Sequence, residues 1–209
     1  MAARVRRTQV ERSASTRARL LDATLDCLVD RGYAGTTLTE VADRAGVSRG
    51  AQLHHYPTKA ELVIAAMEHL FEKREREFRQ AVEAVPLGAH RVAAAIDALW
   101  QVVSGPSFHA WLELAVAART DEELRRAMTA LSDRASDNIE RTFHDLFPAP
   151  SPPNPMFELA PKFTFAVMHG MALEQLVVKD DGRWTEILEA LKRLSWLALD
   201  RSGMGGELG

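Results

Sequence analysis

The run R-A-G-V-S-R-G-A-Q-L-H-H-Y-P-T-K-A-E-L, residues 44–62, constrains the fold most because it interrupts a helical pattern twice. Gly46 suits the left-handed position just past the end of a helix, and Pro57 cannot continue a helix comfortably. Between them, Ser48 can cap a short helix that lasts to about His55. The run therefore predicts the end of one helix, a tight turn, a second short helix and the start of a third helix.

Capping boxes mark the helices on either side of this interruption. Thr37-x-x-Glu40 opens a short helix and Thr58-x-x-Glu61 opens a long one, because these side chains bond the free N–H groups of a helix start. An earlier helix is predicted to end before Gly32. All three carry apolar residues at helical spacing: Leu21, Leu25, Leu28 and Val29; Leu38, Val41, Ala42 and Ala45; Leu62, Ala66 and Leu70. The two short helices and their glycine turn form a helix-turn-helix over residues 37–56.

The rest of the chain is predicted to be helical as well. Helices near 90–103, 108–119, 121–147, 156–179 and 184–201 are separated by glycine and proline breakers, including the loop P-A-P-S-P-P-N-P at 148–155. No alternation of apolar and polar residues indicates a strand. The prediction is an all-α fold of about nine helices. It has a flexible basic tail (1–14), a three-helix domain (15–60), a larger helical domain (61–203) and a second flexible tail (204–209).

Composition and charge restrict the partners. No apolar run approaches the roughly 20 residues that span a bilayer, and no apolar stretch follows the basic amino terminus, so we expect neither membrane nor export. A single cysteine, Cys27, predicts a small buried side chain and a reducing, cytoplasmic setting. Residues 1–60 hold ten Lys/Arg against six Asp/Glu, and residues 61–209 hold sixteen against twenty-three. A basic N-terminal part joined to an acidic remainder indicates that only the N-terminal part contacts a polyanion.

The second short helix holds the residues expected to read DNA. In a helix-turn-helix this helix enters the major groove with its first residues toward the base edges. Arg49 can pair with a phosphate or bidentately with guanine. Gly50 costs about 1 kcal/mol against alanine in a helix, so it either lets DNA approach closely or permits tight packing inside the protein. The candidate row is Ser48, Arg49, Gly50, Ala51, Gln52, Leu53, His54 and His55.

This region resembles the DNA-binding domain of the tetracycline-repressor (TetR) family over about residues 16–62. The matching features are Gly32-Tyr33, Thr36-Thr37, Val41-Ala42, Ala45-Gly46-Val47-Ser48, Gly50, His55-Tyr56 and Lys59. The remaining residues match the family only in architecture. The resemblance implies a homodimeric repressor that binds a palindromic, double-stranded operator. It also implies release when a small molecule binds the larger domain.

The resemblance also implies roles for individual residues. Thr37 is at a helix start where N–H groups and a hydroxyl can hold a phosphate, and Thr39 and Arg44 lie on the DNA side of that helix. His55 and Lys59 match phosphate-contacting positions. Two tyrosines are assigned to the core instead of the DNA surface: Tyr33 and Tyr56.

The triplet Gln52-Leu53-His54 departs from the family pattern. A tyrosine whose hydroxyl usually reaches the phosphate backbone is replaced by Leu53, which can instead contact a thymine methyl group or a sugar. Gln52 falls where an inward aliphatic residue is usual. It either reads adenine or caps a group inside the protein.

The larger domain is expected to bind an apolar or aromatic effector and to form the dimer. Pockets in helical bundles are mostly apolar with a few polar groups, and the candidate wall residues are Trp100, Phe108, Trp111, Met128, Phe165, Met168 and His169. By the same resemblance, the last two helices pair with their copies in a four-helix bundle. The candidate dimer residues are Phe163, Val167, Met171, Ile187, Leu191, Leu194 and Leu197.

Metal binding and catalysis are competing hypotheses. His54 and His55 are adjacent and diverge on a helix, so they cannot easily share a metal. The pairs His109–Glu113 and Glu140–His144 have ligand spacing without a third partner. No phosphate-binding glycine loop or nucleophile elbow is present, so we predict no cofactor, metal or catalytic residue. The alternative function is a helical small-molecule-binding protein or enzyme with a vestigial helix-turn-helix.

Overall fold

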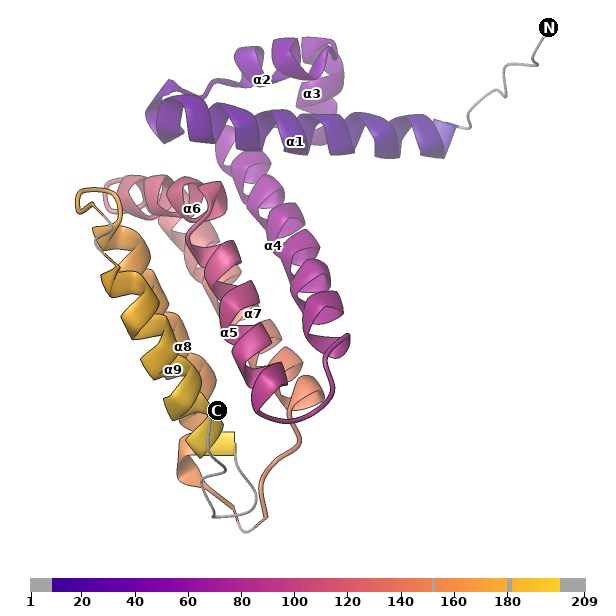
Figure 1. Ribbon diagram of the computed structural model, residues 1–209. Helices are drawn as coiled ribbons and strands as arrows, with labels where there is room; N and C mark the ends of the chain where they lie inside the picture. The colour runs from indigo at the N-terminus through magenta and orange to yellow at the C-terminus, as the bar shows by residue number, and fades with distance from the viewer. Residues whose placement is uncertain (1–8, 152, 180–181, 200–209) are drawn as a thin grey trace, which may run out of the picture. The chain divides into compact units, whose positions relative to one another are not determined.

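The computed structural model describes residues 9–151, 153–179 and 182–199. These residues form helices and connecting turns without a strand, so the all-α prediction is confirmed (Figure 1). The helices are α1 (Gln9–Gly35), α2 (Leu38–Ala45), α3 (Arg49–His55), α4 (Lys59–Glu83), α5 (Ala89–Val103), α6 (Pro106–Ala117), α7 (Glu122–Leu146), α8 (Pro155–Glu174) and α9 (Arg183–Leu199). Among the described residues, no helix is long and apolar enough to cross a bilayer.

The ends of the chain differ in part from the expectation of flexible tails. Residues 9–14 were expected in the tail, but they form the first turns of α1, so this part of the prediction is wrong. The expected tail at 204–209 lies outside the described residues, as do residues 1–8. The predicted break at Gly32 is present, since this glycine has φ 66° and ψ −179° inside the segment assigned to α1.

Two compact units account for the packing, and their division differs from the predicted boundary at residue 60. Unit 1 combines the chain up to Phe71 with residues 109–132, and unit 2 combines residues 72–108 with the chain from Asp133 onward. The helix-turn-helix therefore shares a unit with α6 and the first half of α7.

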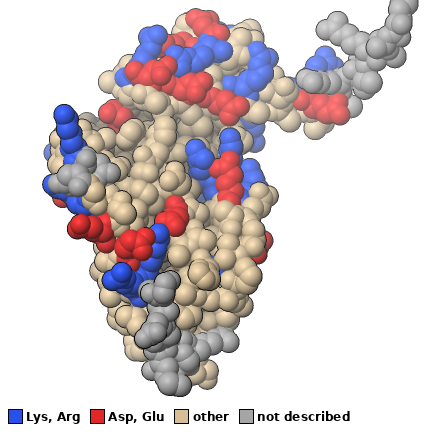
Figure 2. All heavy atoms as spheres, in the orientation of Figure 1, with Lys and Arg blue, Asp and Glu red and all other residues tan. Residues whose placement is uncertain are grey.

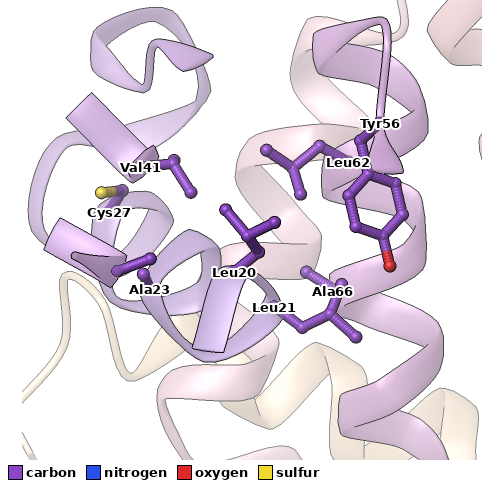
Figure 3. Close-up of a cluster of buried hydrophobic side chains, with 9 residues drawn as sticks. Leu20, Leu21, Ala23, Cys27, Val41, Tyr56, Leu62 and Ala66 are labelled. Carbon is purple, nitrogen blue, oxygen red and sulfur yellow. The ribbon is translucent and has the colours of Figure 1, made fainter. Parts of the chain in front are cut away.

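Two apolar clusters stabilise unit 1. The first joins α1, α2 and α4 and includes Cys27, whose side chain is fully buried as predicted (Figure 3). Tyr56, predicted to pack onto the first helix, is only 6% exposed and belongs to this cluster. In the second cluster, α1 and α4 pack against α6 and α7. Its buried members are Leu28, Val63, Met67, Ala110, Leu114, Ala118, Leu124, Met128 and Leu131, and Tyr33 lies partly buried against them.

Unit 2 is built from the second half of α4 together with α5, α8, α9 and the end of α7. Its core includes Val82, Val92, Leu146, Phe147 and Phe157. Proline 155 stands at the start of α8, where its missing N–H group costs nothing, and Asn154 caps that helix by accepting a hydrogen bond from Met156 N at 3.0 Å.

Candidate nucleic-acid interface

Local capping chemistry forms the two short helices where the sequence predicts them. Thr37 Oγ1 accepts a hydrogen bond from Glu40 N at 3.2 Å, and Ser48 Oγ accepts one from Ala51 N at 3.2 Å. Gly46 ends α2 in the left-handed conformation, with φ 61° and ψ 39°. A hydroxyl has one donor and two acceptor sites, so Thr37 caps its helix and keeps an O–H group for a further acceptor.

Arg19 holds the turn of the motif, and sequence reasoning missed it. Its Nη2 atom donates hydrogen bonds to the carbonyl oxygens of Ala45 and Gly46, the latter at 2.7 Å. The guanidinium thereby satisfies carbonyl groups that lack partners at the end of α2 and ties the turn to α1. No motif signals this role, because Arg19 is distant from the turn in sequence and reaches it only through the packing of α1 on α2.

The outward face of α3 carries most of the predicted row. Ser48, Arg49, Gly50 and His54 are exposed, and the Leu53 side chain is 42% exposed. A Cβ atom added at Gly50 would meet nothing within 4 Å. The packing explanation for Gly50 is therefore wrong, since the glycine makes no close contact inside the protein.

Gln52 is the residue of this row that the structure moves elsewhere. It has no exposed surface, and its Nε2 donates a hydrogen bond to the Tyr56 carbonyl at 2.7 Å. Its predicted place among the DNA-contacting residues is wrong, because it faces the core one helical turn before the buried Tyr56. Gln52 instead caps a group inside the protein, which was the other alternative for this residue. Its Oε1 atom is buried and has no hydrogen-bond partner among the residues that the structure describes.

The remaining predicted cations near the motif bind partners within the protein. Arg44 pairs with Asp30 at 2.7 Å. Lys59 Nζ donates to the Tyr33 carbonyl and lies 3.9 Å from the centre of the Tyr33 ring. Burial lowers the pKa of Lys59, with Asp121 opposing the shift. Lys59 must leave both contacts to reach a phosphate, so this geometry makes it a link between α1 and α4.

The other predicted DNA-side residues lie at the surface to different degrees. Thr39 is exposed on α2, and Ala51 and His55 are half-buried on α3. The rings of His54 and His55 stand edge to face, with centroids 5.6 Å apart.

The seven predicted pocket residues divide between the two units. Trp111 and Met128 pack in the second cluster of unit 1, where Met128 is 5% exposed. In unit 2, the His169 ring stacks on Phe108 at 5.6 Å and meets the edge of Phe165 at 5.7 Å. Burial lowers the pKa of His169 and so favours its neutral form. The two remaining members, Trp100 and Met168, are buried in unit 2.

The predicted dimer residues divide by exposure. Phe163, Leu194 and Leu197 are 45%, 54% and 59% exposed, and Val167 and Ile187 are half-buried. Met171 and Leu191 are 4% and 3% exposed, so assigning them to a subunit surface is wrong. Both helices are apolar on several sides, and the sequence did not show which side faces inward. Three further apolar residues of α8 are exposed and were missing from the prediction: Met156, Leu159 and Leu173.

The Glu140–His144 pair considered for metal binding has other partners. His144 lies 3.3 Å from Glu158, and Glu140 forms an ion pair with Lys162 at 3.0 Å. Within the described part of the chain, no group of three His, Cys, Asp or Glu residues could hold a metal ion.

Comparisons with known proteins agree with this architecture. Residues 20–66 match the family model of bacterial regulatory proteins of the tetR family. The chain is 36% identical to the HTH-type transcriptional regulator CymR of Pseudomonas putida over 129 residues, 62% of this chain and 64% of CymR. It is 30% identical to the uncharacterized HTH-type transcriptional regulator Mb2936c of Mycobacterium bovis over 167 residues, 80% of this chain and 86% of that protein.

Solved structures show the same fold. The crystal structure of a putative TetR-family transcriptional regulator from Rhodococcus sp. superposes with a TM-score of 0.70 and 20% identity, covering 90% of this chain and all of the other. The helix-turn-helix at α2–α3, the all-helical fold and these matches agree. The chain belongs to the TetR family of transcriptional regulators.

Proposed function

We propose that this regulator is a dimeric repressor that reads a palindromic operator with α3 and leaves it when a small apolar or aromatic molecule binds the larger domain. The observation that carries the proposal is the outward face of α3. It presents Arg49 and His54 beside an open position at Gly50, while Gln52 and Tyr56 anchor the opposite face in the core. A helix exposed in this way can enter a major groove without rearrangement of its own unit.

Dimer formation is supported by apolar surface on α8 and α9. Six side chains on these helices are about half exposed: Met156, Leu159, Phe163, Leu173, Leu194 and Leu197. Large apolar side chains exposed in such number on two helices that pack together are typical of an interface. In a dimer, the two recognition helices would contact successive major grooves, which are roughly 34 Å apart.

Effector binding is supported by the aromatic group around His169 in unit 2. Phe108 and Phe165 flank a half-buried imidazole whose pKa is lowered by burial, so the wall offers apolar surface and one neutral polar ring. Such a lining suits a neutral, flat molecule better than a charged one, because burying an unpaired charge costs several kcal/mol or more. A coupling of about 1–3 kcal/mol would lower operator affinity five- to 150-fold.

A salt-titrated binding assay with DNA flanking the gene tests the repressor proposal. We expect a preference for one palindrome and an affinity that falls steeply with salt. Arg49→Ala should weaken binding, whereas Arg119→Ala, an exposed arginine between α6 and α7, serves as the matched control. If the wild-type chain shows no palindrome preference and both variants bind alike, the alternative of a vestigial helix-turn-helix would be favoured.

A further inference from the structure

The positive charge at the front of the chain lies ahead of the helix-turn-helix core. Residues 1–19 hold six arginines and one glutamate, a net charge of +5, whereas residues 20–60 hold four Lys/Arg and five Asp/Glu, a net charge of −1. Attraction to phosphates supplies much of the affinity of DNA-binding proteins and essentially all of their non-specific binding. The segment that carries α3 therefore contributes no net positive charge to that attraction.

Most cations of this segment are also paired within the protein. Arg31 lies 2.8 Å from Glu40, and Arg44 and Lys59 bind Asp30 and the Tyr33 carbonyl. Figure 2 shows positive and negative side chains interleaved on the face of α1–α3 that it displays. Within residues 20–60, Arg49 is the one Lys or Arg with no such partner.

The first turns of α1 form an exposed arm that extends beyond the core of unit 1. Residues 9–14 are all exposed, and the first fully buried side chain of the helix is Leu20. At 1.5 Å per residue, about 16 Å of helix precede Leu20. Figure 1 shows α1 continuing past α3 in this direction. We refer to residues 9–19 as the N-terminal arm.

One side of the N-terminal arm is polar, basic and free of acids. Arg19 marks the side that faces the α2–α3 turn, because its guanidinium binds the carbonyl groups there. A helix turns about 100° per residue, so Arg12, seven residues earlier, returns to within about 20° of the same side. Ser15 and Thr16 lie on this stripe between them, and Glu11 lies about 100° from Arg12. Arginine and hydroxyl side chains are common phosphate ligands.

The arm starts beside the end of the recognition helix. Arg17 Nε donates a hydrogen bond to the Tyr56 hydroxyl at 2.8 Å, and Tyr56 directly follows α3. The stripe itself meets the turn that leads into α3, because Arg19 binds the Ala45 and Gly46 carbonyls there. With α3 in the major groove, the stripe would therefore face the phosphates that border the half-site. We propose that the N-terminal arm binds the DNA backbone flanking each operator half-site through Arg12, Ser15 and Thr16. This inference rests on the proposed operator binding and assigns the phosphate attraction to the arm.

The test compares full-length wild-type protein with Arg12→Ala and Arg12→Glu on two duplexes. One duplex carries the operator with long flanks, and the other ends flush with the half-sites. Each lost phosphate contact lowers the slope of log K against log salt by about 0.9, or about 1.8 for two arms. Over a fourfold rise in salt, the wild type should therefore lose about tenfold more affinity than Arg12→Ala on the long duplex. Arg12→Glu should bind this duplex more weakly still.

The controls separate this inference from the proposed function. On the flush duplex, wild type and Arg12→Ala should bind alike, and the ranking of operator base substitutions should be the same for both. Arg12 is exposed and has no ion-pair partner in the described part of the chain, so thermal unfolding should not change. If Arg12→Ala keeps the wild-type slope and affinity on the long duplex, the arm is not a DNA contact, even though operator binding stands. A wild type without operator preference would instead overturn the proposed function.

Discussion

Replacing Gly50 by alanine should make the protein more stable and a poorer DNA binder. A Cβ atom at this position meets nothing within 4 Å, so the methyl group causes no clash in the folded chain. Alanine is favoured over glycine in a helix by about 1 kcal/mol, which corresponds to a rise in Tm of about 2–4 °C for a chain of this length. On the outward face of α3, the same methyl group would separate the helix from the groove. We expect operator affinity to fall about tenfold, or about 1.4 kcal/mol.

Gly46→Ala provides the contrast for this experiment. Gly46 has φ 61°, which costs other residues about 1–2 kcal/mol, and its added Cβ would lie 2.8 Å from Arg19 Nη2. This variant should lower the Tm, whereas Gly50→Ala should raise it. Thermal unfolding by circular dichroism and anisotropy titration of a labelled operator give the two quantities. If Gly50→Ala is stabilised but binds the operator as tightly as the wild type, the backbone at Gly50 does not approach DNA closely. If Gly50→Ala has a lower Tm than the wild type, the space around Gly50 is not open.

Three further predictions concern the dimer, the aromatic group and the core of the motif. Leu197→Asp should convert a dimer to a monomer in sedimentation experiments, whereas Leu87→Asp, at an equally exposed leucine (61% against 59%), should not. His169 has a lowered pKa when folded, so its contribution to stability is complete above about pH 6.5 and is lost as pH falls. Urea midpoints between pH 5 and 8 should show this loss, and His169→Phe should reduce it. Gln52→Glu buries a carboxylate against the Tyr56 carbonyl and should destabilise the fold at pH 7. The loss of stability should be smaller at pH 4, because a protonated acid can donate a hydrogen bond to that carbonyl. Wild-type stability of the variant at both pH values would contradict the burial of residue 52.

Sequence reasoning succeeded where the determinants are local. Thr37, Gly46 and Ser48 act on backbone groups within a few residues, so capping and turn chemistry placed α2 and α3 correctly. It placed Gln52 among the DNA-contacting residues while leaving an internal role open, and the structure gives this residue the internal role, with no exposed surface and a hydrogen bond to the Tyr56 carbonyl. It also missed Arg19, whose partners lie far along the chain. Met171 and Leu191 show a third limit, since a helix apolar on several sides does not identify its inner face.

The shared core of unit 1 has a consequence for how the protein is made. Leu28, Val63 and Met67 of the first helices pack on Leu114 and Leu124, which are translated later. A nascent chain that has released only the helix-turn-helix would expose these apolar side chains to solvent. The DNA-reading unit can therefore complete its core only after residue 132 has left the ribosome. A fragment cut near residue 60, or a chimera grafted there, would lack the same supporting surface.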